Sequence, residues 1–366
     1  MSGSAVMADW MGRALELAAS ADFQTSPNPM VGAVVVKDGE LVGAGCHRRA
    51  GLPHAEVVAL DMAGPEARGA DLWVTLEPCC HRGRTGPCTE RVIAAGIRRV
   101  HIATVDPNPL VDGRGIASLR AAGIEVELGE REKDARRLIE AYAVWVTTGL
   151  PFISIKIAMS LDGRVATVSR QSQWITSEEA RVEGHGLRHS HDAVLVGSQT
   201  VLDDDPALTA RHLQREGHQP WRVVLDGRLR TPVDSRLLAS PGGPVILFTA
   251  PGSAPRRHLL ERAGARVITV AAVDGRPSIR AVMRRLARMG VLSVLVEGGP
   301  TVLASLQAER LGNRLVVFMA PSVLGGVGAP GPFGGPGVDS LSHGWSWRFT
   351  GISRIGPDLR IEAEAA

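Results

Sequence analysis

Two short stretches determine how this sequence is interpreted: HAE at residues 54–56 and PCCHRGRTGPC at residues 78–88. They supply one imidazole, from His54, and two thiolates, from Cys79 and Cys88. These are typical ligands of a catalytic zinc ion, which keeps a fourth position for water. Zinc lowers the pKa of that water toward ~7 and so produces hydroxide at neutral pH. The pattern therefore predicts a catalytic zinc site.

Glu56 is expected to act beside this metal without binding it. It lies two residues after His54 in the first turn of a predicted helix, where its carboxylate can face the water and move protons. The alternatives are a closed zinc site, with Cys80 or His81 as fourth ligand, and a set of buried free thiols. Adjacent cysteines rarely reach one ion with good geometry, so Cys80 is interpreted as a packing residue. Cys46 is interpreted as a small core hydrophobe.

The first half of the chain alternates apolar strand patterns with helical ones. Strands are expected at residues 31–36, 41–45, 72–76, 100–105 and 124–128, and helices at residues 10–19, 54–63, 89–95 and 130–146. The turn Asp38-Gly39 joins the first two strands into a hairpin. A hairpin followed by βαβ units predicts a mixed sheet covered by helices on both faces.

A second domain is expected to begin near residue 150. The chain has 366 residues, about twice the usual domain length, and the segment Thr147–Pro151 breaks the preceding helical pattern with turn chemistry. Residues 1–147 and 150–366 are therefore assigned to two domains. In the second domain strands are expected at residues 153–157, 193–196, 222–226, 245–249, 267–270, 291–296 and 315–320, and an ordered loop at residues 325–337.

The composition is that of an ordinary folded chain, with 44% hydrophobic and 22% charged residues. No stretch approaches 18 uncharged apolar residues, and Met1–Trp10 lacks the pattern of a secretion signal. A cytoplasmic protein without membrane contact is therefore expected. All four cysteines lie in the first quarter, which favours a metal site over a disulfide framework.

Charge is divided unevenly between the two halves. The first 150 residues carry 16 basic and 19 acidic side chains, whereas the remainder carries 25 and 19, so the net charges are −3 and +6. A basic second half suits a phosphorylated ligand such as NADPH, although solvated arginines are the more common explanation.

The two opening stretches resemble the cytidine deaminase-like superfamily, whose signature is H-x-E followed by P-C-x-x-C. Eight residues rather than two separate the ligand cysteines here, which is similar to the branch that deaminates the riboflavin precursor, a diaminopyrimidinone carrying a ribose phosphate. The resemblance implies a three-layer α/β/α domain with zinc on His54, Cys79 and Cys88, and with Glu56 as the catalytic proton shuttle.

The same resemblance suggests how this first site binds its substrate. Asn28, in a rigid proline-flanked loop, offers a donor and an acceptor to a pyrimidine edge. His47, His81 and Arg84 form a cationic patch that suits a ribose 5-phosphate. Taken singly, each of these three is better explained as a surface charge; for Asn28 the alternative is a simple turn residue.

The second half lacks the G-x-G-x-x-G fingerprint of a Rossmann fold. Instead, EGGPT at residues 297–301 follows a predicted strand and precedes a helix, where a phosphate can approach backbone N–H groups. Residues 156–163, 172–176, 192–197 and 200–211 resemble, in the same order, the reductase domain of the riboflavin pathway. The resemblance implies a dihydrofolate reductase-like α/β domain that binds NADPH across the carboxyl ends of its strands.

Residue roles in this second domain follow from the resemblance by position. The residues that would contact NADPH are Ala158, Trp174, Thr200, Asp204 and the turn that contains Gly299, Pro300 and Thr301. The residues that would hold the substrate are Ser172, Arg188, Leu208, Arg211 and Glu297. Arg188 and Arg211 suit the substrate phosphate, because guanidinium groups bind phosphate bidentately. The place of Lys156, on the surface or near the substrate, stays open.

The chain is accordingly predicted to be a bifunctional deaminase and reductase of riboflavin biosynthesis. Zinc and NADPH are its expected cofactors, a phosphoribosyl pyrimidine its partner, and a homodimer or homotetramer its assembly. A nucleic-acid-editing deaminase is disfavoured, because the first half is acidic and only 4% of residues are aromatic. Two alternatives remain. One is a zinc-stabilised scaffold that binds metabolites without turnover, and the other is a chain in which only one domain is active.

Overall fold

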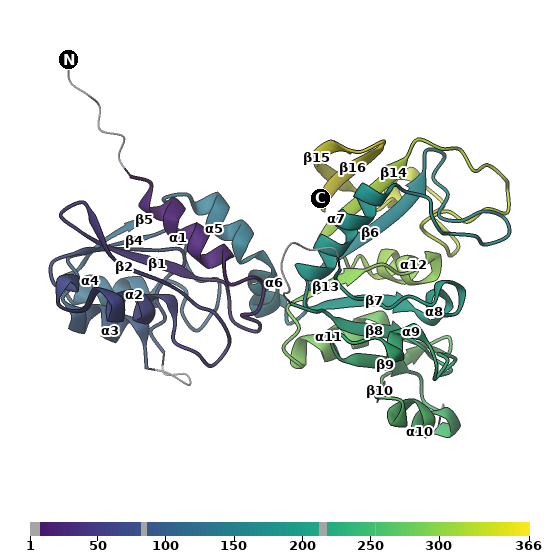
Figure 1. Cartoon of the computed structure of the whole chain (residues 1–366), viewed down its shortest axis with the longest axis horizontal. Coiled ribbons are helices and arrows are strands. Elements are labelled where there is room, and N and C mark those ends of the chain that lie inside the picture. The colour runs from purple at the N-terminus through teal and green to yellow at the C-terminus, as the bar shows by residue number, and fades with distance from the viewer. Residues whose placement is uncertain (1–7, 82–85, 212–217, 253) are drawn as a thin grey trace, which may run out of the picture. The chain divides into compact units, whose positions relative to one another are not determined.

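The computed structural model describes residues 8–81, 86–211, 218–252 and 254–366. Contacts divide the chain into two units, residues 1–149 and residues 150–366 (Figure 1). Among the described residues, no helix combines the length and apolar character needed to span a membrane. Each unit is described on its own below.

The first unit is built on a five-stranded mixed sheet in the order β2-β1-β3-β4-β5. β1 pairs antiparallel with β2 and β3, whereas β3, β4 and β5 run parallel. The strands are β1 Gly32–Lys37, β2 Glu40–Cys46, β3 Asp71–Val74, β4 Arg99–Ile102 and β5 Glu125–Leu128. The helices are α1 Trp10–Ala19, α2 Ala55–Ala63, α3 Cys88–Ala95, α4 Arg114–Ala121, α5 Glu132–Leu138 and α6 Glu140–Thr148, with a 3₁₀ turn at Gly64–Ala67.

Helices cover both faces of this sheet, as predicted. Figure 1 shows α1 and α5 on one side and α2, α3 and α4 on the other. On the first side Met11 and Ala14 of α1 pack against Val34 and Val36 of β1.

On the opposite side, α2 lies unusually close to β2. A Cβ atom placed on Gly43 would lie 2.2 Å from the carbonyl oxygen of Ala59, and one on Gly45 would lie 2.7 Å from that of Ala55. Real Cβ atoms essentially never approach so closely, so both glycines are needed for α2 to dock. This docking fixes the start of α2, which carries His54 and Glu56.

The second unit contains a nine-stranded sheet in the order β10-β9-β8-β7-β13-β6-β14-β16-β15. The strands from β10 to β14 pair parallel, whereas β16 pairs antiparallel with both β14 and β15, the strand at the edge. The strands are β6 Phe152–Ser160, β7 Ala193–Gly197, β8 Trp221–Leu225, β9 Val245–Thr249, β10 Ala265–Thr269, β13 Ser293–Val296, β14 Arg314–Ala320, β15 Trp347–Ile355 and β16 Asp358–Ala365; β11 Ala272–Val273 and β12 Arg276–Pro277 form a separate ribbon. The helices are α7 Glu178–His189, α8 Ser198–Asp204, α9 Arg236–Ala239, α10 Ala254–Arg262, α11 Ile279–Arg288 and α12 Pro300–Glu309, with a 3₁₀ turn at Leu341–His343.

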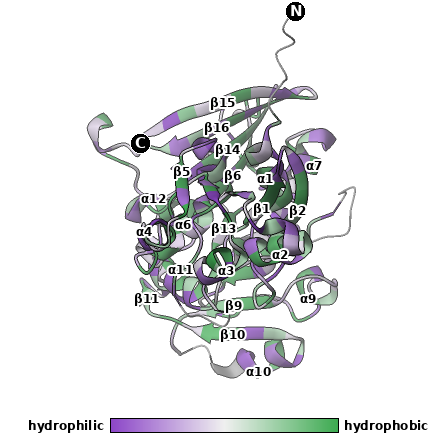
Figure 2. Cartoon of the chain, turned by 90° about the vertical axis from the view of Figure 1, so that its left-hand side faces the viewer, coloured by the Kyte–Doolittle hydropathy of each residue, from purple (hydrophilic) through white to green (hydrophobic). Residues whose placement is uncertain are grey.

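The central strands of this sheet are buried on both faces, and their sequences are continuous apolar runs rather than alternating ones. Figure 2 shows β9 as hydrophobic along its length. Leu286 of α11 and Leu306 of α12 belong to one core cluster, whereas Leu237 of α9 and Leu260 of α10 belong to another. Because these strands are parallel, their carboxyl ends lie at the same end of the sheet, where ligand sites are expected.

Most predicted elements are confirmed to within a few residues, but one expectation was wrong and one hairpin was missed. The single helix expected at residues 130–146 is broken at Ile139, which is buried and has non-helical φ and ψ of −105° and 12°. The hairpin of β15 and β16 was not predicted, because most residues of β15 are exposed and carry no apolar alternation. The expected loop at residues 325–337 contains no helix or strand.

Candidate active sites

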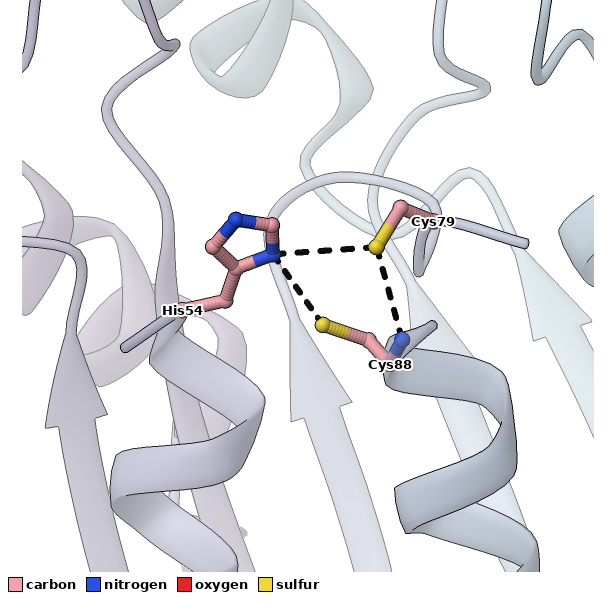
Figure 3. Close-up of side chains that lie close together, drawn as sticks. All are labelled: His54, Cys79 and Cys88. Atoms are coloured by element: carbon pink, nitrogen blue, oxygen red, sulfur yellow. Dashed lines mark hydrogen bonds between the residues drawn. The ribbon is translucent and has the colours of Figure 1, made fainter. Parts of the chain in front are cut away.

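Three predicted metal ligands come together at one end of the first sheet (Figure 3). His54 is the residue that precedes α2, in an extended conformation, and Cys88 is the first residue of α3. Cys79 lies in the loop that follows β3. Two helix starts and one strand end therefore hold the three side chains, and each position is fixed by packing of its element on the sheet.

The spacing of the three ligand atoms fits a zinc ion. The Nδ1 atom of His54 lies 3.1 Å from the Sγ of Cys88 and 3.7 Å from the Sγ of Cys79. On a tetrahedral zinc ion, bonds of about 2.0 Å to nitrogen and 2.3 Å to sulfur separate such atoms by roughly 3.5 Å. Among the described residues, this cluster has no fourth metal-binding member, so it leaves room for a water ligand rather than forming a closed site.

The protonation of the three groups also suits a cation. Hydrogen bonds from Cys88 and His54 lower the pKa of Cys79 to about 4, as in a thiolate. Hydrogen bonding to Cys79 raises the pKa of His54, and the interaction with Cys79 raises that of Cys88. Without a metal, these groups share protons across short contacts, whereas a divalent cation favours the deprotonated form of each.

Glu56 lies beside this cluster and lines the adjoining cavity. Its side chain is buried, with 4% of the residue exposed. Burial, reinforced by the charge of Cys79, raises the pKa of Glu56 to about 7. A cation bound at the cluster would favour the carboxylate and oppose this shift. A carboxyl group that changes protonation near neutral pH is well suited to carry protons.

The cavity in front of the cluster has a volume of about 430 Å³. Asn28 and His47 are among the residues that line it. His47 Nδ1 lies 3.0 Å from the carbonyl oxygen of Pro53, to which it donates, so its Nε2 accepts from the amide nitrogen of Asn28 at 3.0 Å. His47 is 2% exposed, and burial lowers its pKa. The lowered pKa favours the neutral imidazole, whose contact with Asn28 also suits a ring edge; the expected phosphate contact of His47 stays a prediction.

The other two members of the expected patch have different outcomes. His81 is exposed and lines the cavity, in a position that remains compatible with a phosphate contact. Arg84 lies outside the described residues.

Four residues that sequence reasoning missed also line this cavity: Asp106, Asn108, Tyr142 and Trp145. Asp106 and Asn108 follow β4, a parallel strand whose carboxyl end faces the metal cluster. Polar residues after such a strand are a recognisable signal of a ligand site, and the DPN sequence at residues 106–108 carried it. Tyr142 and Trp145 belong to α6, far away in the sequence.

Glu77 connects the metal loop to the loop after β4. Its buried carboxylate accepts hydrogen bonds from the backbone N–H groups of Asp106 at 3.1 Å, Gly113 at 3.0 Å and Ile116 at 3.1 Å. Because Glu77 lies two residues before Cys79, these hydrogen bonds connect the loop of a metal ligand to the segment that contains Asp106.

Replacing Glu77 by glutamine is expected to lower the free energy of unfolding of the first unit by about 2–4 kcal/mol, because an amide nitrogen would face buried N–H donors. Thermal unfolding followed by calorimetry measures the effect. The matched control is Glu90→Gln, which makes the same chemical change at an exposed position on α3. Equal unfolding temperatures for the two variants would contradict this role of Glu77.

A second cavity, with a volume of about 590 Å³, lies in the second unit and has the size of a cofactor or substrate pocket. Every predicted cofactor and substrate residue of this unit lines it: Ala158, Ser172, Trp174, Arg188, Thr200, Asp204, Leu208, Arg211, Glu297, Gly299, Pro300 and Thr301. The hydroxyl of Ser172 donates to Asp204 at 2.6 Å, which joins two segments of the wall.

The glycine turn at residues 297–301 connects β13 to α12, as predicted. A Cβ atom on Gly298 would lie 2.7 Å from the side chain of Val302, so the turn requires glycine there. The turn therefore presents backbone N–H groups at the start of a ten-residue helix, where an anionic phosphate is favoured. This cradle and the volume of the cavity fit a cofactor that carries phosphate groups.

A half-buried charge cluster lies beside the turn. Arg188 donates to both carboxylate oxygens of Glu297, from Nε at 2.7 Å and from Nη2 at 2.8 Å. Burial alone would raise the pKa of Glu297, but the charge and hydrogen bonds of Arg188 outweigh it and lower this pKa to about 2. The guanidinium of Arg188 thus pairs with Glu297. Arg188 and Arg211 both line the cavity, and a phosphate contact of either residue stays a prediction.

Lys156, whose place the sequence did not decide, projects from β6 into the same cavity. Burial lowers the pKa of its amine, and the neighbouring charge of Glu297 opposes the shift. An amine with a lowered pKa gives up its proton more readily than a surface lysine.

Comparisons with known proteins agree for both units. Residues 6–104 match the family described as the cytidine and deoxycytidylate deaminase zinc-binding region, and residues 151–361 match the RibD C-terminal domain. The riboflavin biosynthesis protein RibD of Aquifex aeolicus is 42% identical over 354 residues, which cover 96% of this chain and 97% of that protein.

Two solved structures are similar along nearly the whole chain. RibD of Acinetobacter baumannii matches with a TM-score of 0.88 and 36% identity, covering 98% of each chain. A diaminohydroxyphosphoribosylaminopyrimidine deaminase/5-amino-6-(5-phosphoribosylamino)uracil reductase of Thermotoga maritima matches with a TM-score of 0.85 and 35% identity, again covering 98% of each. The predicted fold class, a deaminase-like α/β domain followed by a reductase-type α/β domain, is confirmed.

Proposed function

The chain belongs to the RibD family of riboflavin biosynthesis proteins, and from this premise we propose how its two units divide a two-step reaction. The family makes it a bifunctional deaminase and reductase with a zinc-binding deaminase region. We assign deamination to residues 1–147 and reduction to residues 150–366. The observation that carries the assignment is the separation of a metal cluster in one unit from a glycine-turn cavity in the other.

In the first step, the proposed substrate is 2,5-diamino-6-(5-phosphoribosylamino)pyrimidin-4(3H)-one. Zinc, held by His54, Cys79 and Cys88, would activate water for attack on the ring carbon that bears the amine. Glu56 would carry a proton from the water to the ring nitrogen and then to the departing amine, which leaves as ammonia. Asn28 and His47 would hold the ring edge, and His81 and Arg84 the phosphate.

In the second step, the deaminated product would enter the cavity of the second unit. NADPH, bound across Ala158, Trp174, Thr200, Asp204 and the turn of Gly299, Pro300 and Thr301, would supply the hydride. The carbon–oxygen bond that closes the ribose ring breaks as its carbon is reduced, and the ring oxygen needs a proton. Lys156 is half-buried, interacts with the charge of Glu297 and is the proposed donor of that proton.

The substrate in this step is held by residues around Lys156. Ser172, Leu208 and Arg211 line the cavity, and we propose that Arg211 contacts the substrate phosphate. Arg188 would act by holding Glu297 in its charged form. The net charge of +6 on the second half supports a cofactor with the extra phosphate, NADPH rather than NADH.

Removal of the metal tests the division of labour. A zinc chelator is expected to abolish ammonia release from the diamino substrate, and added zinc to restore it, because the three ligands lie in the first unit. NADPH oxidation with the deaminated substrate should continue at its original rate in the same sample. Ammonia release that survives verified zinc removal, or reduction that stops with it, would contradict the assignment.

Compartment and assembly complete the proposal. NADPH and phosphorylated pyrimidines are intracellular metabolites, so we propose the cytoplasm as the compartment of this protein.

We also propose a homodimer or homotetramer that forms through the second unit, because the edge strand β15 exposes Phe349 and Ile352 at 69% and 66%. Light scattering after size-exclusion chromatography measures the assembly; a monomer at micromolar concentration would contradict it.

A further inference from the structure

Helix α6 forms part of the wall of the first cavity, although it is the last helix before the second unit. Tyr142 and Trp145 are three residues apart, so they lie on the same face of the helix, and both line the cavity. The break at Ile139 gives α6 a direction of its own, and Tyr142 is left 7% exposed. None of the reaction steps above uses either residue.

The hydroxyl of Tyr142 joins two polar residues that also line the cavity. It donates to Oδ1 of Asp106 at 3.2 Å and accepts from the amide nitrogen of Asn108 at 3.4 Å. The same Oδ1 accepts from the backbone N–H of Asn108 at 2.9 Å. Burial and the carboxylate of Asp106 raise the pKa of Tyr142, so its hydroxyl stays protonated and remains a donor.

The orientation of the Asn108 amide follows from its second contact. Its oxygen accepts from the backbone N–H of Leu110 at 3.0 Å, so the nitrogen is the atom next to Tyr142. That nitrogen carries two hydrogens, of which Tyr142 takes one. The wall thus places a carboxylate acceptor beside an amide donor, which complements a ring edge where an amine neighbours a carbonyl.

We propose that Tyr142 is a positioning residue of the deaminase site: its hydroxyl holds Asp106 and Asn108 in place to bind the amine and carbonyl edge of the pyrimidine. The inference rests on the proposed function of the first unit. It adds a specificity element that lies on the helix leading directly into the reductase unit.

The first test is Tyr142→Phe, which removes one oxygen and keeps the ring. A hydrogen bond to a charged group is lost, so KM for the diamino substrate in ammonia release should rise roughly 10- to 100-fold, while kcat changes less than about threefold. Thr147→Val is the matched control, because it removes an exposed hydroxyl from the same helix that bonds only its own backbone in the described contacts. Its KM should equal that of the wild type.

A purely structural role predicts a different result. It would lower the unfolding temperature of Tyr142→Phe and leave KM unchanged, and that outcome overturns the proposal. If the wild-type protein itself releases no ammonia, the proposed function fails before this inference is tested, so the two failures are distinguishable.

A second readout uses the fact that Tyr142 is the only tyrosine in the chain. Incorporation of 3-fluorotyrosine therefore labels the cavity with a single fluorine. Its NMR resonance should shift on addition of the deaminated product, 5-amino-6-(5-phosphoribosylamino)uracil, and should not shift with inorganic phosphate. If the chemical shift of this fluorine stays unchanged at saturating product, the proposal is overturned, whatever the kinetics of the Tyr142→Phe variant.

Discussion

Replacing Glu56 by glutamine is expected to lower the rate of ammonia release by roughly 10²- to 10⁴-fold, the contribution typical of a positioned proton-transfer group. Glutamine keeps the shape of the side chain but cannot carry a proton between water, ring nitrogen and amine. Zinc should remain bound, because His54, Cys79 and Cys88 are untouched. Steady-state ammonia assays and metal analysis of the same sample measure the two effects.

The control is Glu66→Gln, an exposed carboxylate in the turn after α2. It should retain the wild-type rate, and both variants should reduce the deaminated substrate normally. A Glu56→Gln variant that releases ammonia at the wild-type rate would contradict the proton-shuttle role. Zinc binding without turnover in the wild type and in both variants would instead favour a metabolite-binding scaffold.

Replacing Lys156 by methionine is expected to lower NADPH oxidation with the deaminated substrate by roughly 10²- to 10⁴-fold. Methionine fills the same space in the cavity but has no proton for the oxygen that leaves the sugar ring. Glu297 also loses a neighbouring positive charge, although Arg188 still pairs with it. Ammonia release belongs to the other unit and should be unaffected.

The comparison variant is Lys133→Met, the same change at an exposed position on α5. It should leave both activities at the wild-type level. NADPH oxidation by Lys156→Met within about threefold of the wild type would exclude Lys156 as the proton donor, since a general acid contributes far more than that.

The metal cluster could be predicted from the sequence because its chemistry is local. His54, Cys79 and Cys88 are residue types with few other reasons to recur at these spacings, and each sits at the end of a predictable element. The cavity of the second unit was likewise predictable, because its residues lie in ordered motifs along the chain.

Tyr142 could not be predicted in the same way. Its approach to Asp106 depends on the helix break at Ile139, which the sequence pattern does not reveal. Burial of Ile139 and packing of α6 decide that geometry, and both are properties of the folded unit. Asp106 itself carried a signal, as a polar residue after a parallel strand.

Charge was the property that sequence alone interpreted least well. The family resemblance implied that His47 and Arg188 contact a phosphate. In the structure, burial lowers the pKa of His47, and hydrogen bonds connect its ring to Pro53 and Asn28. The guanidinium of Arg188 donates two hydrogen bonds to Glu297. Whether a basic side chain is available depends on its partners, which come from distant segments.

The most direct test of the whole account is a single assay that starts from the diamino substrate with purified protein, zinc and NADPH, and follows ammonia and NADPH together. We predict one ammonia released and one NADPH oxidised per substrate, with NADPH oxidation lagging behind ammonia. In the Glu56→Gln variant both signals should be lost, and addition of the deaminated substrate should restore NADPH oxidation alone. NADPH oxidation that precedes ammonia release, or that proceeds at the wild-type rate in this variant from the diamino substrate, would contradict the proposed order and the division between the two units.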